Sequence, residues 1–105
     1  MLAEAKKIVI ITESIIEEKV IQLLNTHEVK GYTVYRNLTG KGERGIRSGF
    51  GGLVSLGENV CIELIVSDEN RALVIMEAVY NKFLAKNYAG ITYLEDIRVI
   101  RPKKF

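Results

Sequence analysis

Four stretches of the chain carry the hydrophobic pattern of β-strands. The first holds four consecutive isoleucine or valine residues, a β-branched run that is typical of a buried strand. The second and third alternate between apolar and polar side chains with the period of two that a strand requires. In the last stretch we expect Ile97 and Val99 to face inward. The predicted strands cover residues 7–12, 32–38, 59–66 and 91–100.

Two further stretches carry apolar residues at helical spacing. The first lies between the first two predicted strands and predicts an amphipathic helix that ends near His27. The second lies before the last strand, and residues 87–90 are expected to break it. The apolar stripe of the first helix comprises Ile16, Val20, Leu23 and Leu24, and that of the second comprises Ala72, Ile75, Met76, Val79 and Phe83.

The ends of these helices carry local signals. Ser14 followed by Glu17 has the spacing of a capping box at the start of the first helix. Gly31 is expected to turn the chain from this helix into the second strand. Ser67 or Asp68 can cap the second helix through a side-chain oxygen.

The resulting order, β-α-β-β-α-β, predicts an α+β fold of the ferredoxin-like type. Two helices would cover one face of a four-stranded antiparallel sheet. The opposite face also carries apolar or half-polar side chains, among them Tyr35, Cys61, Ile65 and Tyr93. A sheet that is apolar on both faces needs a second layer. We therefore expect a homo-oligomer in which the open sheet faces meet.

Composition narrows the possible classes of protein. The 105 residues, 48% of them hydrophobic and 27% charged, have room for one domain, which we place at 1–105. A single cysteine, Cys61, excludes an internal disulfide framework, and one histidine, His27, leaves too few ligands for a structural zinc site. No apolar run approaches the roughly 18 residues that span a bilayer, and the N-terminus is not built like a signal peptide. We expect a soluble, cytoplasmic protein.

The net charge of +2 argues against a dedicated nucleic-acid-binding protein, because phosphate neutralisation normally requires a strong basic excess. The basic residues are nevertheless concentrated in residues 36–47 and 98–105. Two small basic clusters on a balanced protein suit a small anion better than a long polyanion. Solvated surface charge is the alternative interpretation.

A glycine-rich segment is the most informative part of the sequence. Seven of the nine glycines lie between residues 40 and 57. Residues 40–45 match the pattern G-x-G-x-x-G, but no helix signal follows, so the match does not indicate a dinucleotide-binding fold. Glycines let backbone N–H groups converge on an anion. The planar guanidinium groups of Arg44 and Arg47 can each donate two hydrogen bonds to a phosphate, and Lys41 adds a compact positive charge. The segment is therefore either a phosphate-binding loop or a flexible basic surface loop.

A second short motif, residues 88–91 (Tyr-Ala-Gly-Ile), precedes the last strand. Its glycine could bring backbone N–H groups to a ligand. A simple helix-terminating turn is the more common role of such a motif.

Together these segments resemble the PII-like signalling proteins, and among them the carbon-sensing branch of SbtB and the carboxysome-associated PII proteins. The resemblance covers about residues 7 to 100. Its most specific part is the string Gly-Lys-Gly-x-Arg-x-x-Arg-Ser after Gly-Tyr-Thr-Val. The resemblance rests on residues 10–13 (Ile-Ile-Thr-Glu), 31–34, 40–48 and 88–91.

The resemblance implies a homotrimer whose intersubunit clefts each bind an adenine nucleotide: AMP, ADP, ATP or cyclic AMP. It places a T-loop at about residues 39–58, a B-loop at about 87–91 and a C-terminal segment at 101–105. The B-loop would face the phosphates through backbone N–H groups, and Thr12 would lie near the nucleoside. The implied nucleotide-binding residues are Thr12, Gly40, Lys41, Gly42, Arg44, Arg47, Ser48, Ala89, Gly90 and Ile91.

The T-loop of such a protein contacts a target protein. The apolar residues expected to make this contact are Phe50, Leu53, Val54 and Leu56. The resemblance points to a bicarbonate transporter or a carboxysome-associated protein as the target, with bicarbonate as a possible second effector. Contact with a membrane would then occur only through the target.

Several features depart from this family pattern. The chain lacks the Cys-Gly-Pro-x-Gly-Cys element of redox-gated SbtB proteins and the T-loop tyrosine of uridylylated PII proteins. Slow hydrolysis of ATP or ADP is one alternative function, but Glu43 is the only acid within the phosphate motif. A metal-handling trimer similar to the CutA proteins is another, but His27 and Cys61 are more readily explained as a helix-end residue and a packing residue. We expect a regulatory protein with no catalytic and no metal-binding residues.

Overall fold

The computed structural model describes residues 2–39 and 58–100 of the chain. Within them the predicted order β-α-β-β-α-β is confirmed. The strands are β1 (Ala3–Glu13), β2 (Thr33–Leu38), β3 (Asn59–Val66) and β4 (Gly90–Val99). The helices are α1 (Glu17–Thr26), preceded by a 3-10 turn (Ser14–Ile16), and α4 (Glu69–Val79), which continues into a π-helical turn (Tyr80–Leu84).

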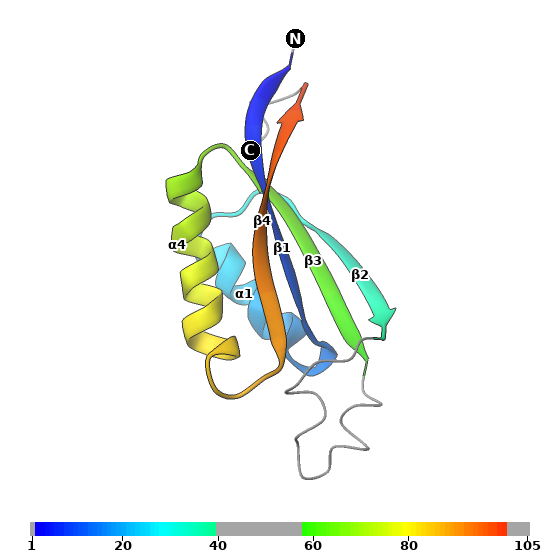
Figure 1. Cartoon of the computed structure of the whole chain (residues 1–105). Coiled ribbons are helices and arrows are strands. Elements are labelled where there is room, and N and C mark those ends of the chain that lie inside the picture. Colours follow the sequence, from blue (N-terminus) through cyan, green and yellow to red (C-terminus); the bar gives the residue numbers. More distant parts are fainter. Residues whose placement is uncertain (1, 40–57, 101–105) are drawn as a thin grey trace.

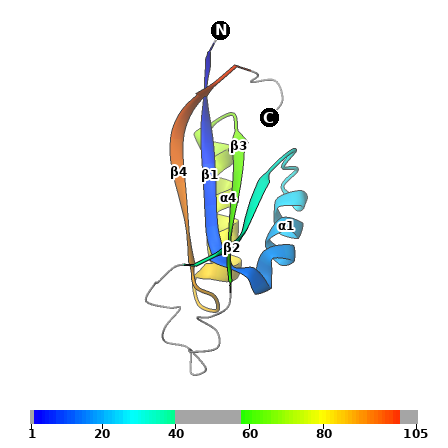
Figure 2. The same ribbon diagram turned by 90° about the vertical axis from the view of Figure 1, so that its right-hand side faces the viewer.

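The strands form one antiparallel sheet in the order β2-β3-β1-β4 (Figure 1). The central strand β1 pairs with β3 through Ile10 and Ile62, and with β4 through Thr12 and Gly90. β1 begins four residues before the predicted strand because its first residues pair with the end of β4, where Ala3 lies opposite Val99. Figure 2 shows β1 and β4 extending beyond the other strands near the two termini.

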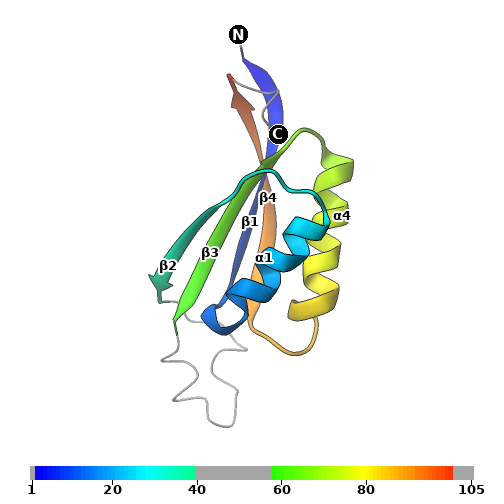
Figure 3. The same ribbon diagram turned by 180° about the vertical axis from the view of Figure 1, so that it is seen from behind.

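The hydrophobic core lies between the sheet and the two helices, which cover the same face (Figure 3). The predicted helical stripes are confirmed, since Val20 and Leu24 of α1 and Ile75 and Val79 of α4 are all buried. Alternate residues of β1 and β3 face these helices. The sheet residues of the core are Ile8, Ile10, Val60, Ile62, Leu64 and Val66.

The opposite face of the sheet carries no helix in the part of the chain that the structure describes (Figure 3). Tyr35 and Tyr93 are exposed there, as the alternation of the sequence predicted. The expectation that Ile97 and Val99 face the helices is wrong. In β4 it is Leu94 that packs against the core, so Ile97, three residues further along the strand, points to the open face.

Two expectations about the helix ends are also wrong. Glu17 does not form a capping box, because no side-chain hydrogen bond caps α1 and the Glu17 carboxylate binds Arg36 instead. Gly31 does not make the turn after α1, since the left-handed residue there is Glu28, with φ 61°. The predicted cap of the second helix is confirmed, because the Asp68 carboxylate accepts a hydrogen bond from the Arg71 N–H at 2.9 Å. No helix among the described residues is long and apolar enough to cross a membrane.

Candidate functional site

One end of the sheet brings together segments that are distant in the sequence. β1 ends there beside the start of β4, and β2 ends beside the start of β3 (Figure 1). Leu38 pairs with Asn59, and Asn59 also pairs with Glu13. The Ser14 N–H donates to the Glu58 carbonyl at 2.9 Å. Both ends of the predicted T-loop therefore lie at the same end of the sheet as the end of β1.

The described part of the predicted nucleotide site meets at this end of the sheet. Thr12, at the end of β1, lies directly opposite Gly90, the first residue of β4. Its buried side chain donates a hydrogen bond from Oγ1 to the Ala89 carbonyl oxygen at 2.7 Å. Ile91 follows on β4 opposite Ile11 and is exposed on the open sheet face. The structure thus places Thr12 and the B-loop residues in one cluster.

The N–H group of Ala89 already has a partner. It donates to Oε2 of Glu13 at 2.7 Å, so the turn before Gly90 is held by two consecutive residues of β1. Sequence reasoning assigned no role to Glu13, although it stands within the Ile-Ile-Thr-Glu segment. The available signal was its position next to Thr12 at the end of the central strand.

Gly90 has a structural reason to be glycine. Its φ of 151° is a conformation that residues with a side chain rarely adopt, and a Cβ atom would lie 2.4 Å from the Ile11 carbonyl oxygen. The same Cβ would meet Leu84 and Thr12 side-chain atoms at 3.0 Å. The glycine therefore allows β4 to begin in close contact with β1, which is a different role from that of a helix-terminating turn.

The remaining predicted site residues fall outside the described residues. They comprise the phosphate-binding candidates Gly40, Lys41, Gly42, Arg44, Arg47 and Ser48 and the target-contact candidates Phe50, Leu53, Val54 and Leu56.

A β-bulge lies at the end of β2, close to the same site. The pairing with β3 shifts between Tyr35 and Leu38, and Asn37 adopts a left-handed conformation with φ 62°. Next to it, the guanidinium of Arg36 binds Glu17 of α1. This hydrogen-bonded pair lowers the pKa of Glu17. Because Arg36 is 19 residues from Glu17, no local sequence signal could have found this contact.

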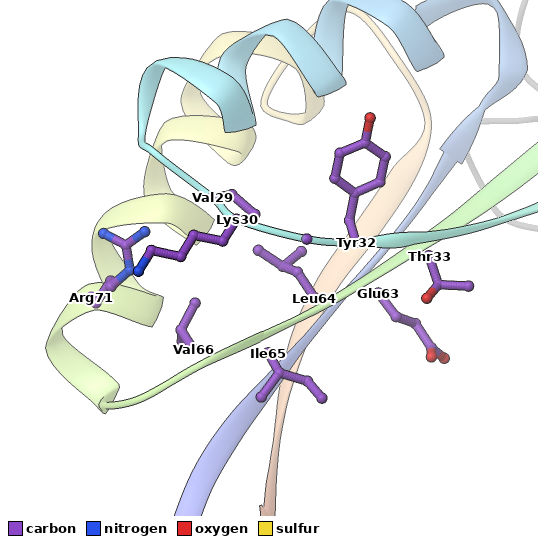
Figure 4. Close-up of a pocket in the computed structure, with 10 residues that line it drawn as sticks. Val29, Lys30, Tyr32, Thr33, Glu63, Leu64, Ile65, Val66 and Arg71 are labelled. Atoms are coloured by element: carbon purple, nitrogen blue, oxygen red, sulfur yellow. The ribbon is translucent and has the colours of Figure 1, made fainter. Parts of the chain in front are cut away.

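A hollow of about 210 Å³ lies elsewhere, between the start of β2, the second half of β3 and α4 (Figure 4). Its charged lining comes from Lys30, Glu63 and Arg71. The Arg71 guanidinium donates to the carbonyl oxygens of His27 and Glu28, at 3.0 and 3.1 Å, so it stabilises the end of α1. Of the predicted nucleotide-binding residues that the structure describes, none lines this hollow.

The described residues also locate the two candidate metal ligands. His27 is the C-cap residue of α1, and Cys61 lies in β3 on the open sheet face. Burial raises the pKa of the Cys61 thiol, which keeps it protonated near neutral pH. Among residues 2–39 and 58–100, no three His, Cys, Asp or Glu side chains are grouped so that they could hold a metal ion.

Comparison with known proteins agrees with this geometry. The family model described as nitrogen regulatory protein P-II matches residues 5–104. A PII-like signalling protein from Thermus thermophilus is 34% identical, with 99% of this chain and 97% of that chain covered and a TM-score of 0.77. CPII from Thiomonas intermedia, in a structure bound to ADP and bicarbonate, is 32% identical over 100% of this chain and 97% of that chain, with a TM-score of 0.80. The same CPII bound to ADP, AMP and acetate gives 30% identity over the same shares and a TM-score of 0.81. The chain therefore belongs to the P-II family of signalling proteins.

Proposed function

We propose that this protein is a cytoplasmic regulator that binds an adenine nucleotide in the clefts of a homotrimer and transmits the bound state to a target protein through residues 39–58. One observation carries the proposal. The ends of the predicted T-loop, Thr12 and the B-loop residues Ala89 and Gly90 lie together at one end of the sheet. Fold likeness adds support, because CPII, which matches the whole chain at 30–33% identity, has been solved with ADP, AMP and bicarbonate.

The open face of the sheet supports assembly into a trimer. Ile91 and Tyr93 are 55% and 40% exposed, although both are large and apolar or aromatic. An apolar face of this kind is normally covered by another layer. The lysine of this face is paired within the chain, since Lys7 Nζ lies 3.2 Å from Glu95 and 3.7 Å from Glu63. The face can therefore pack against another subunit without burying an unpaired cation.

The phosphates would be bound by the basic residues of the T-loop. Arg44 and Arg47 supply charge-assisted hydrogen bonds, and Lys41 supplies a third positive charge. These residues follow β2, which ends at the same end of the sheet as the Thr12 and Ala89 cluster. The protein's own residues thus provide binding and positioning, and we assign it a regulatory role without a catalytic one.

Regulation requires that the nucleotide favour one state of the target-binding segment over another. A discrimination of about tenfold between the two states corresponds to about 1.4 kcal/mol of coupling. We assign the protein to the carbon-sensing branch of the family, with bicarbonate as a second effector. This assignment rests on the sequence motifs and on the CPII structures that contain bicarbonate. A bicarbonate transporter or a carboxysome-associated protein is the proposed target.

Isothermal titration calorimetry tests the proposal. The protein is titrated with AMP, ADP, ATP, cyclic AMP and adenosine, and its mass in solution is measured by light scattering. We expect binding of at least one phosphorylated nucleotide by a trimer. An absence of heat with every nucleotide would contradict the proposal. A pull-down from the native host, with and without ATP, then identifies the target.

A further inference from the structure

The Glu13 carboxylate occupies the backbone N–H donor of Ala89. Its Oε2 accepts the Ala89 N–H at 2.7 Å, in the turn that leads into β4. A carboxylate oxygen resembles a phosphate or bicarbonate oxygen in charge and in its capacity to accept hydrogen bonds. The contact therefore shows that this N–H can bind an oxyanion, and that in this structure the oxyanion belongs to the chain itself.

We propose that Glu13 competes with the anionic part of the ligand for the Ala89 N–H and thereby limits the affinity for oxyanions at this end of the sheet. The inference rests on the proposed nucleotide-binding function and names the residue that tunes it. The competing ligand is an oxyanion, either the phosphate of a nucleotide or bicarbonate.

The carboxylate is held weakly enough to be displaced. It accepts a hydrogen bond from one neutral backbone donor, and within residues 2–39 and 58–100 no Lys, Arg or His nitrogen lies within 4.0 Å of it. Glu13 is also only half-buried, so the carboxylate can move into water. A single hydrogen bond from one backbone N–H to a partly exposed carboxylate can be outweighed by a charged ligand that makes several such contacts.

Contacts other than that of Glu13 also hold the turn. The Thr12 hydroxyl holds the Ala89 carbonyl at 2.7 Å, and the Tyr88 N–H donates to the Phe83 carbonyl at 3.1 Å. Gly90 is fixed by its pairing with Thr12. When the carboxylate moves away, the Ala89 N–H therefore stays in place and becomes available to a ligand.

The negative charge of Glu13 also weakens the binding of anionic ligands, in addition to the competition for the hydrogen bond. A carboxylate that remained beside Ala89 would repel a phosphate or bicarbonate that approached the same donor. It would leave an uncharged nucleoside almost unaffected. Glu13 should thus weaken the binding of anionic ligands selectively.

Two variants separate the effects of the hydrogen bond and the charge. Glu13→Ala frees the Ala89 N–H, whereas Glu13→Gln keeps one oxygen acceptor, removes the charge and replaces the other oxygen by an NH2 donor. Glu18→Gln is the matched control, because Glu18 is an exposed residue in the first turn of α1. Calorimetric titrations use ADP, adenosine and sodium bicarbonate, and the amide resonance of Ala89 is followed by NMR. Thermal unfolding of each variant checks that it is folded.

We expect Glu13→Ala to bind ADP about tenfold more tightly than the original chain and Glu13→Gln about threefold more tightly, in line with the size of charged and neutral hydrogen bonds. Adenosine affinity and the Glu18→Gln control should change less than about twofold, which is the scale of an exposed charge. The Ala89 resonance should shift on titration in Glu13→Ala. A higher affinity for ADP alone identifies a nucleotide phosphate as the competing ligand, and a higher affinity for bicarbonate alone identifies bicarbonate.

The inference would be overturned if folded Glu13→Ala and Glu13→Gln bind both ADP and bicarbonate with unchanged or lower affinity. The proposed function would remain intact in that case. Weaker binding would mean that the carboxylate braces the turn. If no variant binds any nucleotide, the proposed function fails and the inference fails with it.

Discussion

Arg36 of β2 binds both carboxylate oxygens of Glu17 of α1, with Nη2 2.6 Å from Oε2 and Nε 3.0 Å from Oε1. Arg36 lies two residues after Val34, which packs against the core, so the alternation of the strand directs the Arg36 side chain toward the helices. The pair connects the first turn of α1 to the strand that leads into the predicted T-loop. It therefore links the helical layer to the end of the sheet that carries the candidate site.

The first prediction concerns the pH dependence of this ion pair. Arg36 lowers the pKa of Glu17 in the folded protein, so the pair stabilises the fold above the ordinary glutamate pKa of about 4.3. The stabilisation is lost as the pH falls through the lowered folded pKa. Glu17→Gln should therefore lower Tm by a few degrees near neutral pH and show a smaller decrease in Tm on acidification than the original chain.

The effect should be modest, because the Arg36 side chain is 63% exposed and salt screens such pairs. Thermal unfolding at several pH values, at low and high salt, measures it. Glu18→Gln serves as the control for loss of a negative charge alone. Identical pH profiles of Glu17→Gln and the original chain would show that the pair contributes nothing to stability.

The second prediction concerns Gly90. Gly90→Ala should destabilise the fold by at least about 1–3 kcal/mol, the usual range for a side chain forced into such a backbone conformation. The clash of the new Cβ with the Ile11 carbonyl oxygen adds to this cost. Denaturant unfolding measures the difference in the free energy of unfolding.

Gly31→Ala is the matched control for Gly90→Ala. Gly31 has no positive φ, and a Cβ there would meet nothing within 4 Å. The substitution should leave stability unchanged or raise it by about 0.4–1 kcal/mol through the lower entropy of the unfolded chain. Equal effects of the two substitutions would contradict the close approach of β4 to β1.

The fold was largely predictable because most of its elements carry a local pattern. The bounds of β3 agree with the prediction, since its alternation of apolar and polar residues is regular. The first residues of β1 were missed because alanine, glutamate and lysine have little strand propensity, and this part is strand only through its pairing with β4. The same limit applies to Glu17 and Glu28, whose roles depend on partners or geometry outside the local sequence.

The candidate site was predictable only in part. The family resemblance named Thr12 and Ala89 as neighbours of one ligand, and the structure places them in hydrogen-bond contact. The hydrogen bond from the Ala89 N–H to Glu13 could not be predicted, because it joins residues 76 positions apart and matches no motif. The proposed phosphate-binding role of Arg44 and Arg47 remains a prediction from the sequence.

The third prediction concerns these two arginines. Arg44→Ala or Arg47→Ala should weaken ADP and ATP binding by between about 10-fold and 150-fold, since a hydrogen bond to a charged group contributes about 1.5–3 kcal/mol. Adenosine binding should change little, because it has no phosphate. Calorimetry with both ligands measures the difference. Lys19→Ala, at an exposed position of α1, controls for loss of positive charge alone. An equal loss of affinity for adenosine would mean that the arginines shape the loop without contacting phosphate.

The fourth prediction concerns the open face of the sheet. If this face is the contact between subunits, Tyr93→Glu places a charge within it and should dissociate the trimer. Leu73→Glu is a closely matched control, because Leu73 is also large and 42% exposed, compared with 40% for Tyr93, but lies on α4 on the other side of the sheet. Light scattering should show three times the chain mass of 11.8 kDa for Leu73→Glu and a lower mass for Tyr93→Glu.

Deletion of residues 49–56 separates assembly from target binding in the same experiment. The deletion variant should remain a trimer, because the proposed subunit contacts lie on the sheet, and it should lose binding to the target. Dissociation of this variant, or of Leu73→Glu in place of Tyr93→Glu, would show that the subunits meet through another surface. The candidate site would then have to be completed by a different part of the neighbouring subunit, because the Thr12 and Ala89 cluster lies at the end of the sheet, next to Ile91 of the open face.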